Sequence, residues 1–467
     1  MTNVVRMVTI LAVFLPTLAH AAGYDTPMLY SARHMGMGGT AIGSVDDPSS
    51  MFHNPAGLSL SGKGSVMLDV SPLLGQIHGS PDDAKRSIGS NTAASPFFFV
   101  GGAYNVWDRI HVGVAAYVLG GAAGSYSYDF SHLGNSIHSE DAAKLSFIEV
   151  TPTLSVRILD HLRFGASWRA TITSFDRTRT DVSNGGEPII NLDLKMKGTG
   201  LTGFRLGLQG DIGPVDLGVV YRSKVQVDVK ADSVTYSSAE FLNATYQFIL
   251  PAKIGLGAHW RINEIARVAL DLEYIFNSQN DVVYLSGTQV IAGQSAQVNV
   301  PNKTDWIDSF TARIGGALKV SKPVELRAGY IYDTRAANTR YPTAFGSPPG
   351  PTQTGTLGVG YQFSPAFDMS FAAAARYGSA TITDAQSPHD EVKKESPFSG
   401  APGDYSILLI GMYLDARYRF GIVDAPHPEH AEPTLPAPTP EPAPAPAPMP
   451  APEPAPTNPP DTTPPTP

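Results

Sequence analysis

The sequence predicts a transmembrane antiparallel β-barrel of about fourteen strands, with a lumenal hatch before it and a Pro-rich tail after it. Apolar and polar residues alternate repeatedly between Gly62 and Phe420, and period two marks strands with one apolar face. Many of these strands reach about ten residues, the span of a tilted transmembrane strand. Short and long connections also alternate along the whole region. These three observations separate a membrane barrel from a soluble sandwich.

Residues 1–21 have the features of a secretory signal peptide. Arg6 precedes the apolar run Met7–Leu18, and Ala19-His-Ala21 forms a cleavage site. No later segment approaches the roughly 18 uninterrupted apolar residues of a transmembrane helix. The chain has no Cys, which excludes disulfides, thiolate metal sites and a lipid anchor on cysteine. Its net charge of −9 gives no indication of nucleic-acid binding.

Residues 22–61 form a Gly-rich segment without an alternating pattern. Asp47 is a good helix cap with Pro48 at the first helical position, and Asn54-Pro55 caps a second turn. About forty residues are too few for a stable independent domain. We therefore expect this segment to lie as a plug in the lumen.

The barrel region, residues 62–420, contains about fourteen candidate strands. In one of them the apolar row Val215–Val229 alternates with polar residues, and in another the row Tyr246–Trp260 does the same. The predicted strand centres are Leu68, Val100, Val114, Leu154, Ala166, Leu206, Val219, Ile254, Leu270, Ile314, Ala328, Val359, Ala373 and Met412. This pattern predicts lipid-facing side chains at Leu217, Leu270, Ile410 and Met412, and lumen-facing ones at Lys224, Asp271 and Asp415.

The connections predict the orientation. Tight turns occur at 107–110, 159–161, 210–214, 263–265, 321–323 and 364–367, and long polar connections at 75–95, 121–145, 277–305, 334–351 and 382–404. Bacterial outer-membrane barrels have short periplasmic turns, long extracellular loops and an even strand count. We therefore expect a monomer in the outer membrane of a Gram-negative bacterium, surrounded by outer-membrane lipid and lipopolysaccharide, with both termini periplasmic.

The last strand and the tail suggest two further partners. The strand closes on Tyr418 and Phe420, and a terminal strand ending in an aromatic resembles the signal that the barrel assembly machinery recognises. Residues 421–467 contain nearly half of the chain's 40 prolines, which favours extended polyproline II over helix or sheet. This tail is either a solvated spacer or a tether to the cell wall or another periplasmic partner.

At the hatch the chain resembles the FadL-type outer-membrane transporters of long-chain fatty acids and aromatic hydrocarbons. The resemblance rests on Gly36–Gly39, Asp46–Pro48 and Phe52–Leu58. It covers residues 22–420, where the strand rhythm and the segment Pro251–Gly257 are also similar. It implies passive uptake of hydrophobic small molecules through loop capture, an apolar lumenal pocket and lateral exit at a kinked strand. The implied hatch or gating residues are Phe52, Asn54, Pro55, Ala56 and Gly57. Gly120 and Gly121 mark the candidate kink, because glycines can bend a strand and break its pairing.

Other functions remain open. A water-filled porin would have a wide polar lumen without a plug, and a structural or adhesive barrel would use its loops or tail. An enzyme is not expected, since no Gly-x-Ser-x-Gly occurs, although a Ser/His pair could still meet in space. Gly36-x-Gly38-x-x-Ala41 lacks a surrounding βαβ unit, and His427 and His430 fit solvated tail residues, so no cofactor or metal is expected.

Overall fold

A computed structural model describes residues 29–58, 63–82, 84–183, 185–186, 188–237, 239–346 and 348–421. The predicted leader, residues 1–21, lies outside this range. The predicted tail, residues 421–467, lies outside it except for Gly421.

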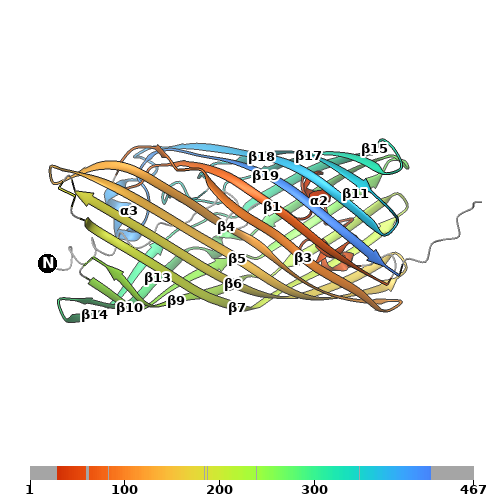
Figure 1. Ribbon diagram of the computed structural model, residues 1–467, viewed down its shortest axis with the longest axis horizontal. Helices are drawn as coiled ribbons and strands as arrows, with labels where there is room; N and C mark the ends of the chain where they lie inside the picture. The colour runs from red at the N-terminus through yellow and green to blue at the C-terminus, as the bar shows by residue number, and fades with distance from the viewer. Residues whose placement is uncertain are drawn as a thin grey trace, which may run out of the picture. The chain divides into compact units, whose positions relative to one another are not determined.

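One antiparallel sheet contains every strand of the described residues (Figure 1). The strands are β1 (Gly64–Gly79), β2 (Ile88–Gly89), β3 (Ala93–Trp107), β4 (Ile110–His132), β5 (Asn135–Leu159), β6 (Leu162–Ser183), β7 (Pro188–Ile212), β8 (Val215–Arg222), β9 (Val225–Tyr236), β10 (Ala239–Leu250), β11 (Lys253–Arg261), β12 (Ala266–Ile275), β13 (Val282–Ile291), β14 (Gln294–Lys303), β15 (Ser309–Lys319), β16 (Val324–Asp333), β17 (Thr352–Gln362), β18 (Phe367–Ile382) and β19 (Gly403–Phe420). The helical turns are α2 (Ala32–Met35), η1 (Pro48–Met51), η2 (Pro55–Gly57), η3 (Asn277–Gln279) and α3 (His389–Glu395).

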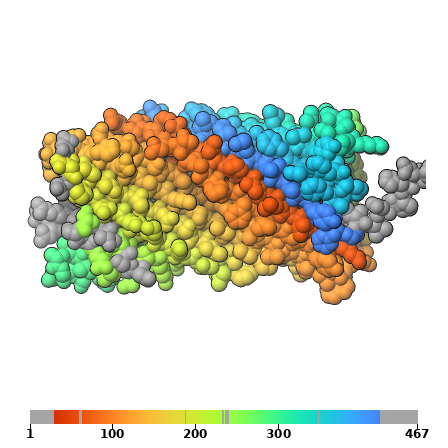
Figure 2. All heavy atoms as spheres, in the orientation of Figure 1, coloured from red at the N-terminus to blue at the C-terminus, as the bar shows by residue number. Residues whose placement is uncertain are grey.

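The sheet closes into a barrel of 14 wall strands, as predicted. Consecutive segments form single interrupted wall strands, because β7 pairs with both β8 and β9, and β10 and β11 pair with β9 and β8. In the same way β12 and β13 are consecutive segments of one wall strand, and β14 and β15 are consecutive segments of the next. Pairing of β1 with β19 over Gly64–His78 closes the wall, and the two strands lie side by side in Figure 2. All fourteen predicted strand centres lie within these strands.

The wall has a different composition in its two halves. We call the end with the short turns the turn end, and the end that carries α3 the loop end. Near the turn end the outer face is apolar, with exposed residues such as Leu68, Leu217, Leu270, Ile410 and Met412. The outward orientation predicted for Leu217, Leu270, Ile410 and Met412 is therefore confirmed, and an apolar outer band is what a hydrocarbon environment requires. No helix among the described residues is long and apolar enough to cross a bilayer.

Towards the loop end the apolar side chains change from the outer face to the inner face of the wall. The predicted apolar rows Val215–Val229 and Tyr246–Trp260 therefore do not each lie on one face, and the prediction for Lys224 is wrong. Ser223 and Lys224 interrupt the wall strand between β8 and β9, so Leu217, Val219 and Tyr221 point outward but Val225, Val227 and Val229 point inward. Lys224 is exposed on the outside and does not face the lumen. Pro251 and Ala252 similarly interrupt the row Tyr246–Trp260, because proline cannot donate to a ladder. The outward positions run 217, 219 and 221 and then 224, 226 and 228, so the chain slips by one residue, and a one-residue slip moves each later side chain to the other face.

This inversion gives the loop-end half a largely apolar interior, in which the ion pairs Arg177–Asp141 and Arg179–Asp181 are also buried. Its buried inward side chains include Phe147, Phe175, Leu194, Met196, Val227, Phe248 and Leu285. The long connections predicted at 121–145 and 277–305 are therefore mostly wrong. The first is the strand hairpin β4–β5 and the second contains η3 and the hairpin β13–β14. Strands continue there because an inward apolar face stabilises them outside the lipid-facing band.

Candidate functional site

The hatch, described over residues 29–58, is built from short capped turns inside the turn-end half of the barrel (Figure 1). Asp47 Oδ1 accepts from the Ser49 amide at 2.8 Å, with Pro48 opening η1. Asn54 Oδ1 accepts from the Ala56 amide at 3.2 Å, with Pro55 opening η2. Both capping predictions are confirmed. A side-chain cap satisfies an amide that a short turn leaves without a backbone partner.

Three wall carboxylates hold the hatch backbone. Asp69 accepts from the Ala32 amide at 3.0 Å, and Asp415 accepts from the Arg33 amide at 2.9 Å. Asp271 accepts from the amides of Ala41 and Ile42 at 2.8 and 3.0 Å. Asp271 and Asp415 thus face the lumen as predicted. A hydrogen bond to a buried carboxyl oxygen contributes about 1 kcal/mol, and these four contacts together hold the hatch against the wall.

Glycines on the inner wall let the hatch backbone touch the strands directly. A Cβ at Gly207 would lie 1.9 Å from Asn54 Oδ1, and one at Gly165 would lie 2.2 Å from the Pro55 carbonyl carbon. We call the following residues the glycine cradle, because a Cβ on each would meet a hatch residue closely: Gly113, Gly165, Gly207, Gly218, Gly257, Gly315, Gly329 and Gly358. The fit between hatch and wall is thus made by backbone shape as well as by charge.

Asn54 joins the hatch to the wall. Its Nδ2 donates to the Ile42 carbonyl at 2.8 Å within the hatch and to the Leu208 carbonyl of β7 at 3.0 Å. Gln209 Nε2 donates to the same Ile42 carbonyl at 3.1 Å. One amide side chain therefore caps a turn, crosses the hatch and contacts the barrel, and it is fully buried.

The surroundings of two titratable hatch residues keep Asp47 ionised and His53 neutral. Burial would raise the pKa of Asp47, but His34, whose Nε2 lies 3.5 Å from Asp47 Oδ2, together with the charges of Arg417 and Arg33 holds that pKa well below its ordinary value. Burial lowers the pKa of His53 well below its ordinary value, and nearby His34 and Arg313 lower it further. His53 is therefore neutral, and its ring packs 5.0 Å from that of Phe52.

The wall next to the hatch is incompletely paired. The β3–β4 ladder reaches Phe99 and Tyr117 and goes no further, although both strands continue. Beyond that point residues 93–98 pair only with β1, and 120–124 pair only with β5. A bulge between Val118 and Gly120 redirects β4, and the Asn91 amide donates to the Ser125 carbonyl at 2.8 Å on the far side. We call this unpaired stretch the wall gap.

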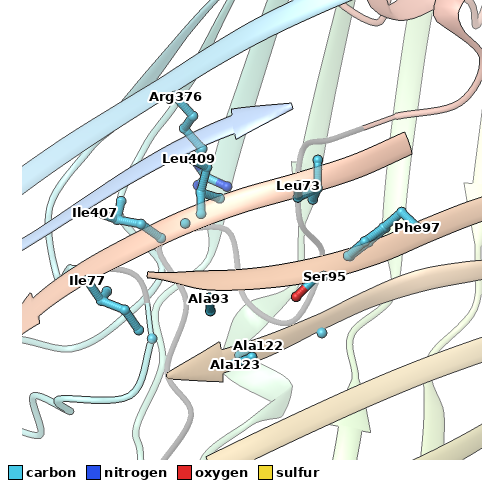
Figure 3. Close-up of a pocket in the computed structure, with 13 residues that line it drawn as sticks. Leu73, Ile77, Ala93, Ser95, Phe97, Ala122, Ala123, Arg376, Ile407 and Leu409 are labelled. Atoms are coloured by element: carbon cyan, nitrogen blue, oxygen red, sulfur yellow. The ribbon is translucent and has the colours of Figure 1, made fainter. Parts of the chain in front are cut away.

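A cavity of about 70 Å³ lies at the wall gap (Figure 3). It is lined by Leu73, Gly75, Ile77, Ala93, Ser95, Phe97, Gly121, Ala122, Ala123, Gly346, Arg376, Ile407 and Leu409. All but Ser95 and Arg376 are apolar or glycine. Arg376 donates from Nε and Nη2 to Thr352 Oγ1 at 3.2 and 2.9 Å and lies 4.0 Å from Asp333 Oδ2.

The loop end is covered by two inserted connections, residues 334–351 and 383–402, the second of which contains α3. Arg340 Nη2 lies 3.1 Å from Glu395 Oε1, Lys303 Nζ lies 3.3 Å from Glu395 Oε2, and Tyr341 Oη also donates to Glu395. Hydrogen bonds from Tyr341 and Arg340 lower the pKa of Glu395 to about 2. An ionised Glu395 thus ties one inserted connection to the other.

In the structure the predicted hatch residues lie against the wall, and the predicted kink residues Gly120 and Gly121 lie at the wall gap. Phe52 packs its ring 5.2 Å from Tyr117, next to the end of the β3–β4 ladder. Gly57 packs against Val45 within the hatch. Gly121 lines the cavity and Gly120 pairs with Phe147. Tyr418 pairs with Val66 in the closing ladder, and Phe420 stacks on Tyr104 at 6.4 Å.

Sequence reasoning missed three parts of this region. Asp69 sits in an ordinary alternating strand, the cradle glycines resemble generic strand glycines, and the connection 334–351 reads as a surface loop. The available signal for the cradle was that many predicted strands contain a glycine on the face opposite their lipid-facing residues.

Comparisons with known proteins agree with this geometry. Residues 12–420 match the model of a family described as outer membrane protein transport protein (OMPP1/FadL/TodX). A putative outer-membrane protein of Neisseria meningitidis serogroup B is 24% identical over 375 residues, covering 68% of this chain and 78% of that protein.

Solved structures share the fold. A Pseudomonas aeruginosa FadL homologue is similar with a TM-score of 0.60 at 17% identity, covering 87% of this chain and 99% of its own. The Pseudomonas putida toluene transporter TodX gives 0.62 at 17% identity, covering 85% and 99%. The Ralstonia pickettii toluene transporter TbuX gives 0.61 at 16%, again covering 85% and 99%. With the family model matching most of its length, this chain belongs to the OMPP1/FadL/TodX family of outer-membrane transport proteins.

Proposed function

We propose that this protein carries hydrophobic molecules, long-chain fatty acids or aromatic hydrocarbons, passively into the outer membrane through the side of its barrel. In this proposal the loop end is extracellular, the turn end is periplasmic, and both chain termini lie in the periplasm. The ligand enters between the inserted connections, occupies the apolar interior of the loop-end half, and leaves through the wall gap. The family and its toluene-transporter relatives support hydrophobic cargo.

The observation that carries the proposal is the wall gap with its apolar cavity. Unpaired strand edges are costly in hydrocarbon unless they line a cavity or contact other protein. The neighbouring outward residues Val70 and Leu74 of β1 are 49% and 42% exposed, which places the gap beside the apolar outer band. An apolar ligand that reaches the gap from the lumen can therefore pass into the lipid without re-entering water.

The two halves of the lumen favour a sideways path. The apolar interior near the loop end offers each buried CH₂ about 0.8 kcal/mol relative to water. The turn-end half is filled by the hatch and by polar side chains such as Glu149, Arg169 and Arg205. An apolar solute would lose its favourable surroundings on that route. Removal of the product downstream is then sufficient to drive net flux.

Blocking the gap tests the proposal. Gly121 is a poor position for a blocking substitution, because a Cβ there would lie 2.4 Å from the Leu145 carbonyl oxygen and disturb β4–β5 pairing. Ala122 lines the cavity, and Ala122→Phe would fill it. Ala116→Phe is the matched control, since Ala116 lies on the same strand beside the outward apolar residues Val100 and Val114.

Uptake of labelled oleate and ethylbenzene by cells and by proteoliposomes is the measurement. Ala122→Phe should abolish uptake while ligand binding to the purified barrel persists, and Ala116→Phe should leave both unchanged. Undiminished uptake by a folded Ala122→Phe variant would place the exit elsewhere. Large steady currents from the wild-type protein in planar bilayers would instead favour the water-filled porin.

Three partner assignments remain predictions. Recognition of Tyr418 and Phe420 by the assembly machinery would appear as slowed barrel insertion of a Tyr418→Ala/Phe420→Ala variant. The role of the Pro-rich tail as spacer or tether lies outside the described residues. Contact with lipopolysaccharide follows from the proposed location.

A further inference from the structure

One side chain of the inserted connection 334–351 lies deep inside the barrel. Phe345 is 3% exposed, although it belongs to a connection between two strands. Its ring meets the Tyr126 ring edge-on, with centroids 5.1 Å apart and planes at 87°. The Arg177 guanidinium carbon lies over the Phe345 ring, 4.9 Å from the ring centroid. We call the space between Tyr126 and Arg177 the ring berth.

The ring berth is built rigidly around a flat group. Arg177 is buried and held by Asp141, with Nη1–Oδ1 at 2.5 Å and Nη2–Oδ2 at 2.8 Å, so the face of the guanidinium stays available. Tyr126 is 1% exposed, and its hydroxyl donates to the Ala344 carbonyl. Edge-to-face and cation–π contacts both need an aromatic partner, and both strengthen when water is excluded. An alkyl group of equal size would gain neither.

The ring berth communicates with the wall gap. A Cβ on Gly124 of β4 would lie 3.1 Å from Ile77 Cδ1 and 3.5 Å from Phe345 Cδ1, so the ring packs where β4 has no side chain. Ile77 and Gly346, the residue after Phe345, both line the cavity at the gap. A molecule that displaces the Phe345 ring would thus lie next to the lateral opening.

We propose that the ring berth is a binding subsite for an aromatic ring and that Phe345 is a built-in competitor which the ligand must displace. This inference rests on the proposed uptake function and names the ligand class of one subsite. The connection is held at the loop end through the partly exposed Arg340 and Glu395. Withdrawal of the Phe345 ring would leave that anchor in place and break the hydrogen bond from the Tyr126 hydroxyl to the Ala344 carbonyl. A competitor on the same chain lowers apparent affinity by the fraction of time it occupies the site.

Equilibrium binding to the purified full-length protein in detergent tests this directly. The probes are ethylbenzene and ethylcyclohexane, which have similar size and differ in aromaticity. Phe345→Ala should bind ethylbenzene at least about tenfold more tightly than wild type and should prefer it to ethylcyclohexane. Phe398→Ala removes a similarly buried ring from the other inserted connection and should leave both affinities within about twofold.

Two further variants isolate the ring berth. Arg177→Lys in the Phe345→Ala background keeps the charge beside Asp141 but removes the planar face, and it should reduce the preference for ethylbenzene while the Tyr126 edge contact maintains part of it. Phe345→Leu keeps an apolar group in place and should give an intermediate gain in affinity for ethylbenzene. This variant serves as the test if Phe345→Ala fails to fold. Equal gains for both probes, or no gain in either variant, would overturn the inference. Failure of wild-type uptake with intact binding would instead overturn the proposed function.

Discussion

Replacing Asn54 with alanine should release the hatch while leaving the barrel closed. Asn54 caps η2 and donates to carbonyls of both the hatch and β7. It contributes nothing to strand pairing, because the ladders around it are made by backbone groups of β7 and its neighbours. The variant therefore separates the hatch–wall contact from the stability of the wall.

The magnitude follows from the lost contacts. Loss of a side-chain cap costs about 1 kcal/mol, and loss of each of the two hydrogen bonds to buried carbonyls costs about 1 kcal/mol more. The sum is about 3 kcal/mol, which raises the ratio of undocked to docked hatch on the order of 100-fold. The wall carboxylates Asp69, Asp271 and Asp415 still hold the hatch, so docking weakens without being abolished.

Hydrogen exchange read by mass spectrometry is the assay. The amides of Ala32, Ala41 and Ile42 donate to wall carboxylates and exchange only when the hatch undocks. Asn54→Ala should accelerate exchange in the peptides covering residues 29–58 by on the order of 100-fold and leave β-strand peptides unchanged. Brief conductance openings in planar bilayers should become more frequent in the same variant.

A matched control is Asn277→Ala, which removes another buried asparagine whose Nδ2 donates to Ser309 Oγ at 2.7 Å, away from the hatch. This control should leave hatch exchange as in wild type. If Asn54→Ala also exchanged like wild type, Asn54 would not couple the hatch to the wall. Acceleration in both hatch and wall peptides would mean that the hatch stabilises the whole barrel.

Three further predictions concern the same contacts and the cover of the loop end. Gly207→Ala should displace the hatch, since its Cβ would lie 1.9 Å from Asn54 Oδ1, and adding Asn54→Ala should relieve that clash, so that the double variant exchanges no faster than Asn54→Ala alone. Docking should weaken as the pH falls below about 6.5, by up to about 1.4 kcal/mol per pH unit, because His53 has a lowered pKa in the docked hatch and takes up a proton only when released. His53→Phe should remove this weakening at low pH in exchange measured between pH 7.5 and 5.5, after correction for intrinsic rates, and a weakening of the same size in the variant would assign it to another group. Glu395→Gln removes the charge that pairs with Arg340 and Lys303, so spin labels on residues 334–351 should become more mobile; unchanged spectra would show that packing alone holds this connection.

Alternation in the sequence was sufficient to identify the wall, because each strand of the lipid-facing band must keep an apolar outer face whatever its neighbours are. Leu217, Leu270, Ile410 and Met412 illustrate this, and so do the fourteen strand centres. Lys224 shows where the rule failed. A slip of one residue at Ser223 and Lys224 leaves each part of the sequence looking periodic, yet it exchanges the inner and outer faces of everything that follows in the strand.

The capped turns of the hatch were also visible in the sequence, since Asp47-Pro48 and Asn54-Pro55 act on amides only two residues away. Contacts over long sequence separations were not. Nothing local in Asp69 or Gly207 indicates that a hatch backbone will lie against it, and Phe345 looks like any loop phenylalanine.

The sequence by itself determined the class, the strand count and the local turns of this protein, because lipid, period two and short-range capping act on neighbouring residues. Only the tertiary structure decided which half of the barrel has an apolar interior, where the wall stays unpaired and what covers that gap. Those features depend on the register between strands that are distant along the chain, and register is set by pairing and bulges in three dimensions.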